Sequence, residues 1–262
     1  MYKRLALIII VGIASIIFWS WVGPWVASPT KFAQESVWLK PLLSLGVLTA
    51  LLGLAFMLLK NILWRIVASV ITGLPFFVIF GFNKFYLLAF GSLILLHLYA
   101  MKNIRAEVEQ RTEIDIRIIM RRGLGMVIMP ILIMVSFAFF FSPNVQASAK
   151  DNQLPPTFKQ VIRTVMAGFL GGELEELPPE EREQTETAIV EEVFNRFNDF
   201  LGPYFKYFPP ILAFGLFLIL QGLSIAFVWL GVGISALLFL VLKRSGLVRI
   251  ELVRKDAEKL QF

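Results

Sequence analysis

A long uncharged and mostly apolar stretch runs from Ile211 to Leu242, and it constrains the fold more than any other feature. It holds 32 consecutive residues without Asp, Glu, Lys or Arg. A bilayer core about 30 Å thick is crossed by a helix of about 20 apolar residues. Charged residues make up 17% of the chain and its mean hydropathy is +0.74, whereas soluble domains are about a quarter charged. The sequence therefore predicts an all-α, polytopic transmembrane bundle whose main partner is the lipid bilayer.

Five further apolar runs reach roughly the length of a membrane-spanning helix, so we predict about six spans. They are Leu5–Val22, Pro41–Leu59, Ile66–Phe82, Phe85–Met101 and Gly123–Phe141. The first run resembles a secretory signal, but its length and the tryptophans at its end favour an uncleaved span. In the second run, Gly46, Ala50 and Gly53 would permit close helix contact. The alternative is that they are scattered small residues facing lipid.

The segment Lys102–Arg122 fixes the predicted orientation. It carries six cations between two apolar runs, and short loops rich in Lys and Arg stay on the cytoplasmic side. Ile211–Leu242 is either one long helix or a hairpin that turns near Gln221–Ser224. A hairpin would place the six cations of the tail outside, so we predict a single long sixth span and two cytoplasmic termini in the cell (plasma) membrane.

These predictions divide the chain into five parts. Residues 1–122 form a four-span block with a basic cytoplasmic hinge, 123–142 the fifth span, 143–208 an acidic extracytoplasmic domain, 209–244 the long sixth span and 245–262 a basic cytoplasmic tail. Residues 143–208 contain six cations and eleven anions, against nineteen and eight in the remainder. This asymmetry is typical of an exported segment beside retained basic loops.

The extracytoplasmic domain is predicted to contain two amphipathic helices. Pro143–Pro156 has the composition of a linker, and Thr157–Leu170 carries apolar residues at helical spacing. A second helix begins at Pro178–Glu181, where proline and acidic residues suit a helix start. Gly202-Pro203 should break or bend it.

A small cytoplasmic ribbon of two strands is a further prediction. Glu113–Ile118 and Val248–Leu252 both alternate polar and apolar residues, which is a strand pattern. Both segments would lie on the cytoplasmic side and run antiparallel. The alternative is one amphipathic interfacial helix and a frayed tail.

Few residues are candidates for chemistry. The chain has no cysteine and one histidine, which excludes disulfides, thiolate nucleophiles and multi-histidine metal sites. His97 is the titratable candidate within a predicted span; we weigh a proton relay against packing near the cytoplasmic interface and favour packing. Gln221 and Ser224 are polar residues within the sixth span, and joining two helices is their more common use.

A cluster of glutamates in the exported segment offers carboxylate oxygens for a divalent cation. It lacks the spacing of a calcium loop, and a solvated helix start explains it more simply. Its members are Glu173, Glu175, Glu176, Glu180, Glu181 and Glu183. We therefore predict no catalytic, metal or cofactor site, and the dispersed basic residues do not indicate nucleic-acid binding.

The sequence predicts a non-enzymatic scaffold or component of a membrane or envelope complex, with a protein partner bound through the extracytoplasmic domain. The alternative is a transporter or channel subunit for a small apolar or lipid-like solute. That alternative predicts a cavity among the spans lined by residues such as His97, Gln221 and Ser224.

Overall fold

The computed structural model describes residues 2–27, 35–111, 113–151, 154, 159, 162–163 and 178–248. These residues form helices and contain no strand. Within them, six helices are long and apolar enough to cross a membrane. Over the described residues, the prediction of an all-α fold with six helices able to span a membrane is therefore confirmed.

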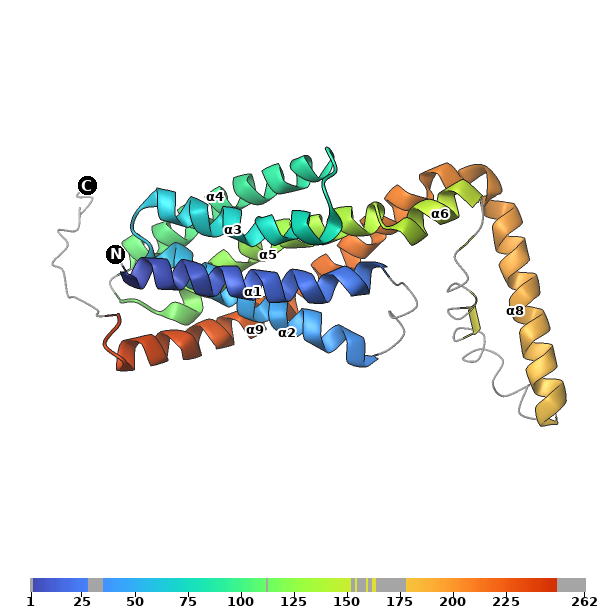
Figure 1. Cartoon of the computed structure of the whole chain (residues 1–262). Coiled ribbons are helices and arrows are strands. Elements are labelled where there is room, and N and C mark those ends of the chain that lie inside the picture. Colours follow the sequence, from blue (N-terminus) through green and yellow to red (C-terminus); the bar gives the residue numbers. More distant parts are fainter. Residues whose placement is uncertain are drawn as a thin grey trace, which may run out of the picture.

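The bundle consists of six long helices that lie side by side (Figure 1). They are α1 (Tyr2–Ala27), α2 (Glu35–Leu58), α3 (Ile62–Phe80), α4 (Tyr86–Gln110), α5 (Ile116–Phe140) and α9 (Phe208–Arg244). Short joints make successive helices antiparallel from α2 to α5. The first turn of α1 and the end of α9 lie at the same end of the bundle, where Lys3 Nζ donates to the Leu247 oxygen at 3.2 Å.

Helix α5 lies at the centre of the bundle. It packs most extensively on α9 and α4 and also contacts α2 and α1. The helices around it expose many large apolar side chains, for example Ile13, Ile16, Val78, Leu88, Leu95, Ile225 and Leu237. An apolar surface of this extent suits lipid rather than water.

Close helix contact along α2 is confirmed. A Cβ atom on Gly46 would lie 2.7 Å from Leu230 Cδ2 of α9, and one on Gly53 would lie 2.7 Å from Leu124 Cδ2 of α5. Ala50, between them, is fully buried. These small residues let α2 approach two helices at once, as small residues do in membrane bundles.

The connection within the basic segment Lys102–Arg122 is shorter than predicted. Helix α4 continues to Gln110 and α5 begins at Ile116, so most of Lys102–Arg122 extends two helices. Arg65, which falls between the predicted spans Pro41–Leu59 and Ile66–Phe82, lies in the first turn of α3 and is 4% exposed.

The predicted ribbon is wrong in its first strand, because Ile116–Ile118 belongs to α5. Asp115 caps that helix: its Oδ1 accepts from the backbone N–H groups of Arg117 at 2.9 Å and Ile118 at 3.4 Å. Val248 is the last described residue of the other segment, and residues 249–252 lie outside the described part of the chain.

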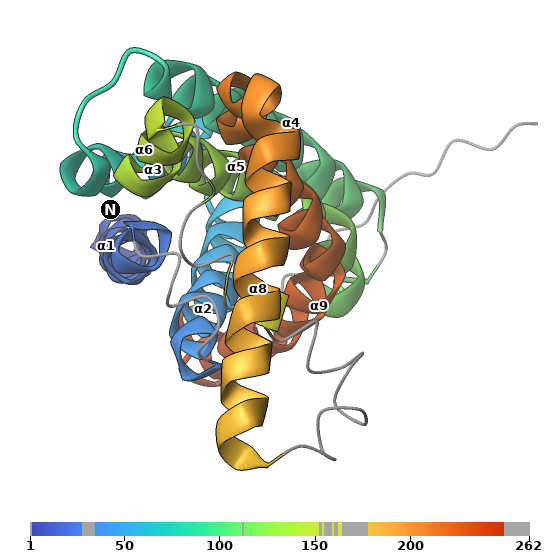
Figure 2. The same ribbon diagram turned by 90° about the vertical axis from the view of Figure 1, so that its right-hand side faces the viewer.

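A smaller group of helices extends beyond the opposite end of the bundle (Figures 1 and 2). It comprises α6 (Pro143–Asp151), α8 (Pro179–Leu201) and the 3₁₀ helix η2 (Gly202–Tyr207). The linker prediction for Pro143–Pro156 is wrong over its first nine residues, which are helical. The predicted helix at Thr157–Leu170 falls mostly outside the described residues.

The predicted break at Gly202-Pro203 is confirmed, since α8 gives way there to η2. Beyond η2 the chain continues as one unbroken helix, α9, of 37 residues. The choice between a long sixth helix and a hairpin is therefore resolved in favour of the long helix.

Candidate functional site

His97 lies at the junction of four helices in the bundle interior and has no exposed surface. Its Nδ1 lies 2.7 Å from Ser69 Oγ of α3, and its Nε2 lies 3.1 Å from the Val127 oxygen of α5. A carbonyl only accepts, so Nε2 carries a proton and donates to Val127, while Nδ1 shares a hydrogen bond with the Ser69 hydroxyl. The Phe56 ring of α2 meets the imidazole edge-on at 5.3 Å. His97 thus holds helices together, and the side chain lines no space that water can enter.

Each of two interhelical carbonyl acceptors lies three residues before a proline. Val127 precedes Pro130 in α5, and Thr72 precedes Pro75 in α3. The Thr72 oxygen accepts from Ser15 Oγ at 2.6 Å and from Trp19 Nε1 at 2.9 Å. A proline removes one bond of the helical ladder and opens the turn before it. Carbonyls in that turn can then accept from a neighbouring helix.

Gln221 and Ser224 do not join helices as the sequence suggested. Ser224 Oγ donates to the Gln221 oxygen of its own helix at 2.6 Å. Gln221 Oε1 is buried and has no hydrogen-bond partner among the described residues. Neither residue hydrogen-bonds to His97, so the three polar residues do not form one site.

The acidic cluster is described only in part. Glu173, Glu175 and Glu176 lie outside the described residues, while Glu181 and Glu183 are exposed on α8. Across the described ranges, no group of three His, Asp or Glu side chains is placed to hold a metal ion.

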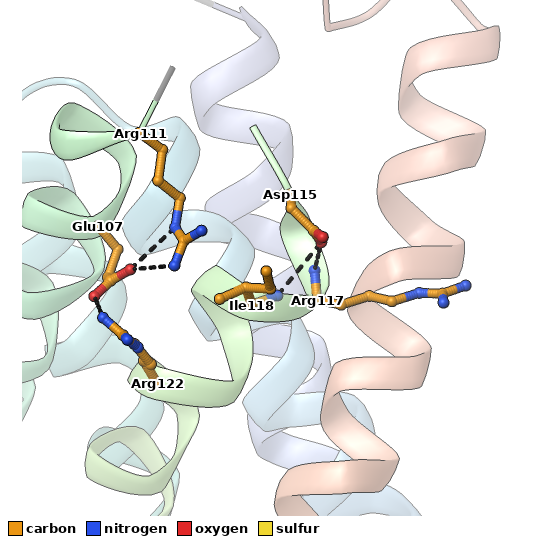
Figure 3. A network of polar contacts seen from close by, with 6 residues as sticks. All are labelled: Glu107, Arg111, Asp115, Arg117, Ile118 and Arg122. Carbon is orange, nitrogen blue, oxygen red and sulfur yellow. Dashed lines mark hydrogen bonds and ion pairs between the residues drawn. The ribbon is translucent and has the colours of Figure 1, made fainter. Parts of the chain in front are cut away.

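The basic end of the bundle is held by an ion network between α4 and α5 (Figure 3). Glu107 of α4 pairs with Arg111 of its own helix, at 3.0 Å between Oε2 and Nη2, and with Arg122 of α5. This carboxylate is 14% exposed. It draws together two of the six cations of Lys102–Arg122, and it thereby links the end of one helix to the start of the next.

A cavity of about 690 Å³ opens at the other end of the bundle. Helices α4, α5 and α9 supply its walls, and Ser136 is the one polar side chain among its described lining residues. The lining residues are Phe85, Leu88, Ile133, Ser136, Phe137, Phe140, Phe141, Pro210, Ala213, Phe214 and Phe217. Ser136 Oγ already donates to the Leu132 oxygen at 2.9 Å. A ligand in this cavity would therefore make mainly apolar contacts.

Sequence reasoning missed this cavity. Its residues come from three separate segments of the chain, 85–88, 133–141 and 210–217, and nearly all are ordinary apolar residues of a span. The residues proposed for a cavity, His97, Gln221 and Ser224, do not line it.

The helices beyond the bundle have a small apolar core of their own. Leu154, Phe194, Phe205 and Phe208 are buried together, and the Leu154 N–H donates to Asn198 Oδ1 at 2.7 Å. Other aromatic residues here remain on the surface: Phe197, Phe200, Tyr204 and Tyr207 are each at least half exposed. This group of helices therefore presents an aromatic surface outside the bundle.

No protein-family model, curated protein or solved structure matches this chain.

Proposed function

We propose that this protein is a non-enzymatic component of a membrane or envelope complex that binds a protein partner through the helices beyond the bundle. The observation that carries the proposal is the exposed aromatic surface on α8 and η2. Phe200 is 73% exposed and Phe197 is 50% exposed. Exposed aromatic side chains are enriched where proteins bind each other.

The polar groups of the bundle interior support a structural role. His97, Ser69, Ser15 and Trp19 are all engaged in hydrogen bonds between helices. Coupled transporters and intramembrane proteases depend instead on charged or nucleophilic groups aimed into an accessible space. Polar groups that form hydrogen bonds with neighbouring helices stabilise the bundle.

The proposed orientation has the basic end in the cytoplasm of a cell with the protein in its plasma membrane. The hinge residues, the start of α1 and the end of α9 share that end, and Lys243 and Arg244 lie in the last turn of α9. The positive-inside rule favours this side for them. The α8 unit would then lie outside the cytoplasm.

Co-purification in mild detergent tests the partner. We compare the unchanged protein, the double variant Phe197→Ser/Phe200→Ser and the control Phe82→Ser, whose ring is 77% exposed in the joint between α3 and α4. A partner should elute with the unchanged protein and the control and be lost from the double variant. A monomeric protein that elutes alone would contradict the proposal.

A second candidate, favoured by the cavity at the outer end, is a transporter or channel subunit for a lipid-like solute. The cavity of about 690 Å³ falls within the range of small-molecule sites, and its apolar walls suit a hydrocarbon chain. Ala213→Phe should fill it and abolish binding of a fluorescent fatty acid. The matched control is Ala226→Phe, because Ala226 is exposed on the same helix. Equal binding by both variants would remove this candidate.

A further inference from the structure

A second cavity, of about 660 Å³, lies at the basic end of the bundle. The first turns of α1, the end of α2 and the end of α9 with the residues just after it form its walls. Most of its lining is apolar: Ala6, Leu7, Ile10, Leu58, Leu59, Leu242, Leu247 and Val248. Tyr2, Lys3, Arg4 and Lys60 complete it.

The three cations of this groove have no anionic partner among the described residues. No described carboxylate forms an ion pair with Lys3, Arg4 or Lys60. No acidic side chain is found among the described residues that line the groove. A cavity that combines positive charges lacking a described counter-ion with an apolar wall is complementary to an amphiphile with an anionic head.

The walls of the groove are fixed by hydrogen bonds between elements. Lys3 Nζ donates to the Leu247 oxygen at 3.2 Å, which joins α1 to the residues after α9. Arg105 of α4 donates from Nη1 to the Lys60 oxygen at 3.1 Å and so holds the turn after α2. The backbone N–H groups of Leu247 and Val248 both donate to the Leu242 oxygen at 3.1 Å. The groove is therefore part of the folded bundle.

We propose that this groove binds one anionic phospholipid, with the phosphate at Arg4 and Lys60 and an acyl chain along the apolar wall. Arginine and lysine form charge-assisted hydrogen bonds with phosphate oxygens. The acyl chain would lie against Ile10, Leu58 and Leu242, where the groove continues the lipid-facing surface of the bundle. A free phosphate ion would leave this apolar wall in water, so the geometry favours the lipid.

Native mass spectrometry of the full-length protein in detergent tests the site, with phosphatidylglycerol or phosphatidylcholine added at equal concentration. The charge variant is Arg4→Gln/Lys60→Gln. Its matched control, Lys102→Gln/Arg117→Gln, removes two exposed cations from the same end of the bundle but outside the groove. A third variant, Ala6→Phe, fills the groove and keeps every charge. Inorganic phosphate serves as the soluble competitor.

The unchanged protein should retain one phosphatidylglycerol and little phosphatidylcholine, and excess phosphate should not displace the lipid. The charge variant should bind phosphatidylglycerol about thirty-fold more weakly, at the usual contribution of a cation near a lipid surface. Ala6→Phe should also lose the lipid, and the control should retain it. If the control binds phosphatidylglycerol as weakly as the charge variant does, the lipid is attracted by the overall positive charge of this end of the bundle, and the proposal is overturned. Equal binding of both lipids, or displacement by phosphate, would overturn it as well.

Discussion

His97 Nε2 of α4 lies 3.1 Å from the backbone oxygen of Val127 in α5, one turn before Pro130. The histidine of one helix thus donates to a carbonyl in the turn before a proline of its neighbour. Pro75 and the Thr72 oxygen repeat the arrangement between α3 and α1. In both pairs of helices, the polar contact between spans is made in the turn before a proline.

Replacing His97 with alanine should destabilise the bundle by roughly 2–5 kcal/mol, because it creates a cavity and leaves the Ser69 hydroxyl without its partner. Ser69→Ala should cost about 1–2 kcal/mol. The matched control is Ser92→Ala, since Ser92 Oγ donates only to Ala89 of its own helix. Unfolding in detergent by denaturant measures all three. If Ser92→Ala lowers the free energy of unfolding as much as Ser69→Ala does, the hydrogen bond between Ser69 and His97 does not stabilise the bundle.

Leucine at Gly53 should destabilise the protein by roughly 1–3 kcal/mol through overpacking. The new side chain would meet Leu124 of α5 and the sulfur of Met120, 2.7 and 2.9 Å from the Cβ position. Gly125→Leu is the control, because no atom lies within 4 Å of a Cβ on Gly125. Thermal unfolding in detergent compares the two variants. If they unfold at the same temperature, α2 does not pack on α5 as described.

Glu107→Gln should lower the melting temperature by removing the ionic link between α4 and α5, and the decrease should shrink as salt is added. Glu192→Gln is the control, since Glu192 pairs with Arg196 within α8 alone. It should leave the melting temperature of the bundle unchanged. If the decrease in melting temperature caused by Glu107→Gln does not depend on salt concentration, the effect arises from packing and not from the ion pairs.

The absence of cysteine from the chain makes single-cysteine labelling a direct test of orientation. A membrane-impermeant maleimide added to intact cells should label Glu183→Cys in α8 and spare Glu113→Cys between α4 and α5. Permeabilised cells should label both positions. The reverse pattern would invert the proposed orientation and place the α8 unit in the cytoplasm.

The six long helices could be predicted from the sequence because lipid leaves the backbone no other partner than itself. The small residues Gly46 and Gly53 also indicated close packing in advance. The break at the end of α8 could be predicted from Gly202-Pro203, since proline cannot continue the hydrogen-bond ladder.

Errors arose where short patterns fit more than one structure. Six alternating residues from Glu113 to Ile118 suggested a strand, yet Asp115 is also a good helix cap, and the apolar residues that follow favour a helix. The polar composition of Pro143–Asp151 suggested a linker, although α6 packs on η2 and α9. Local composition does not report such contacts.

The partners of His97 and both cavities could not be predicted. Ser69 and Val127 are 28 and 30 residues from His97, and their approach depends on how each helix is rotated about its axis. The same holds for Lys60, which reaches the groove of α1 and α9 only because α2 ends beside them.

Because α9 is one unbroken helix, its length can be compared with the thickness of a bilayer. Its 37 residues span about 55 Å, against a hydrocarbon thickness of about 30 Å. A helix of this length tilts in a bilayer or extends beyond it. Because η2 and α8 directly precede α9, removing one helical turn near the start of α9 would shorten the connection between them and the bundle by about 5 Å.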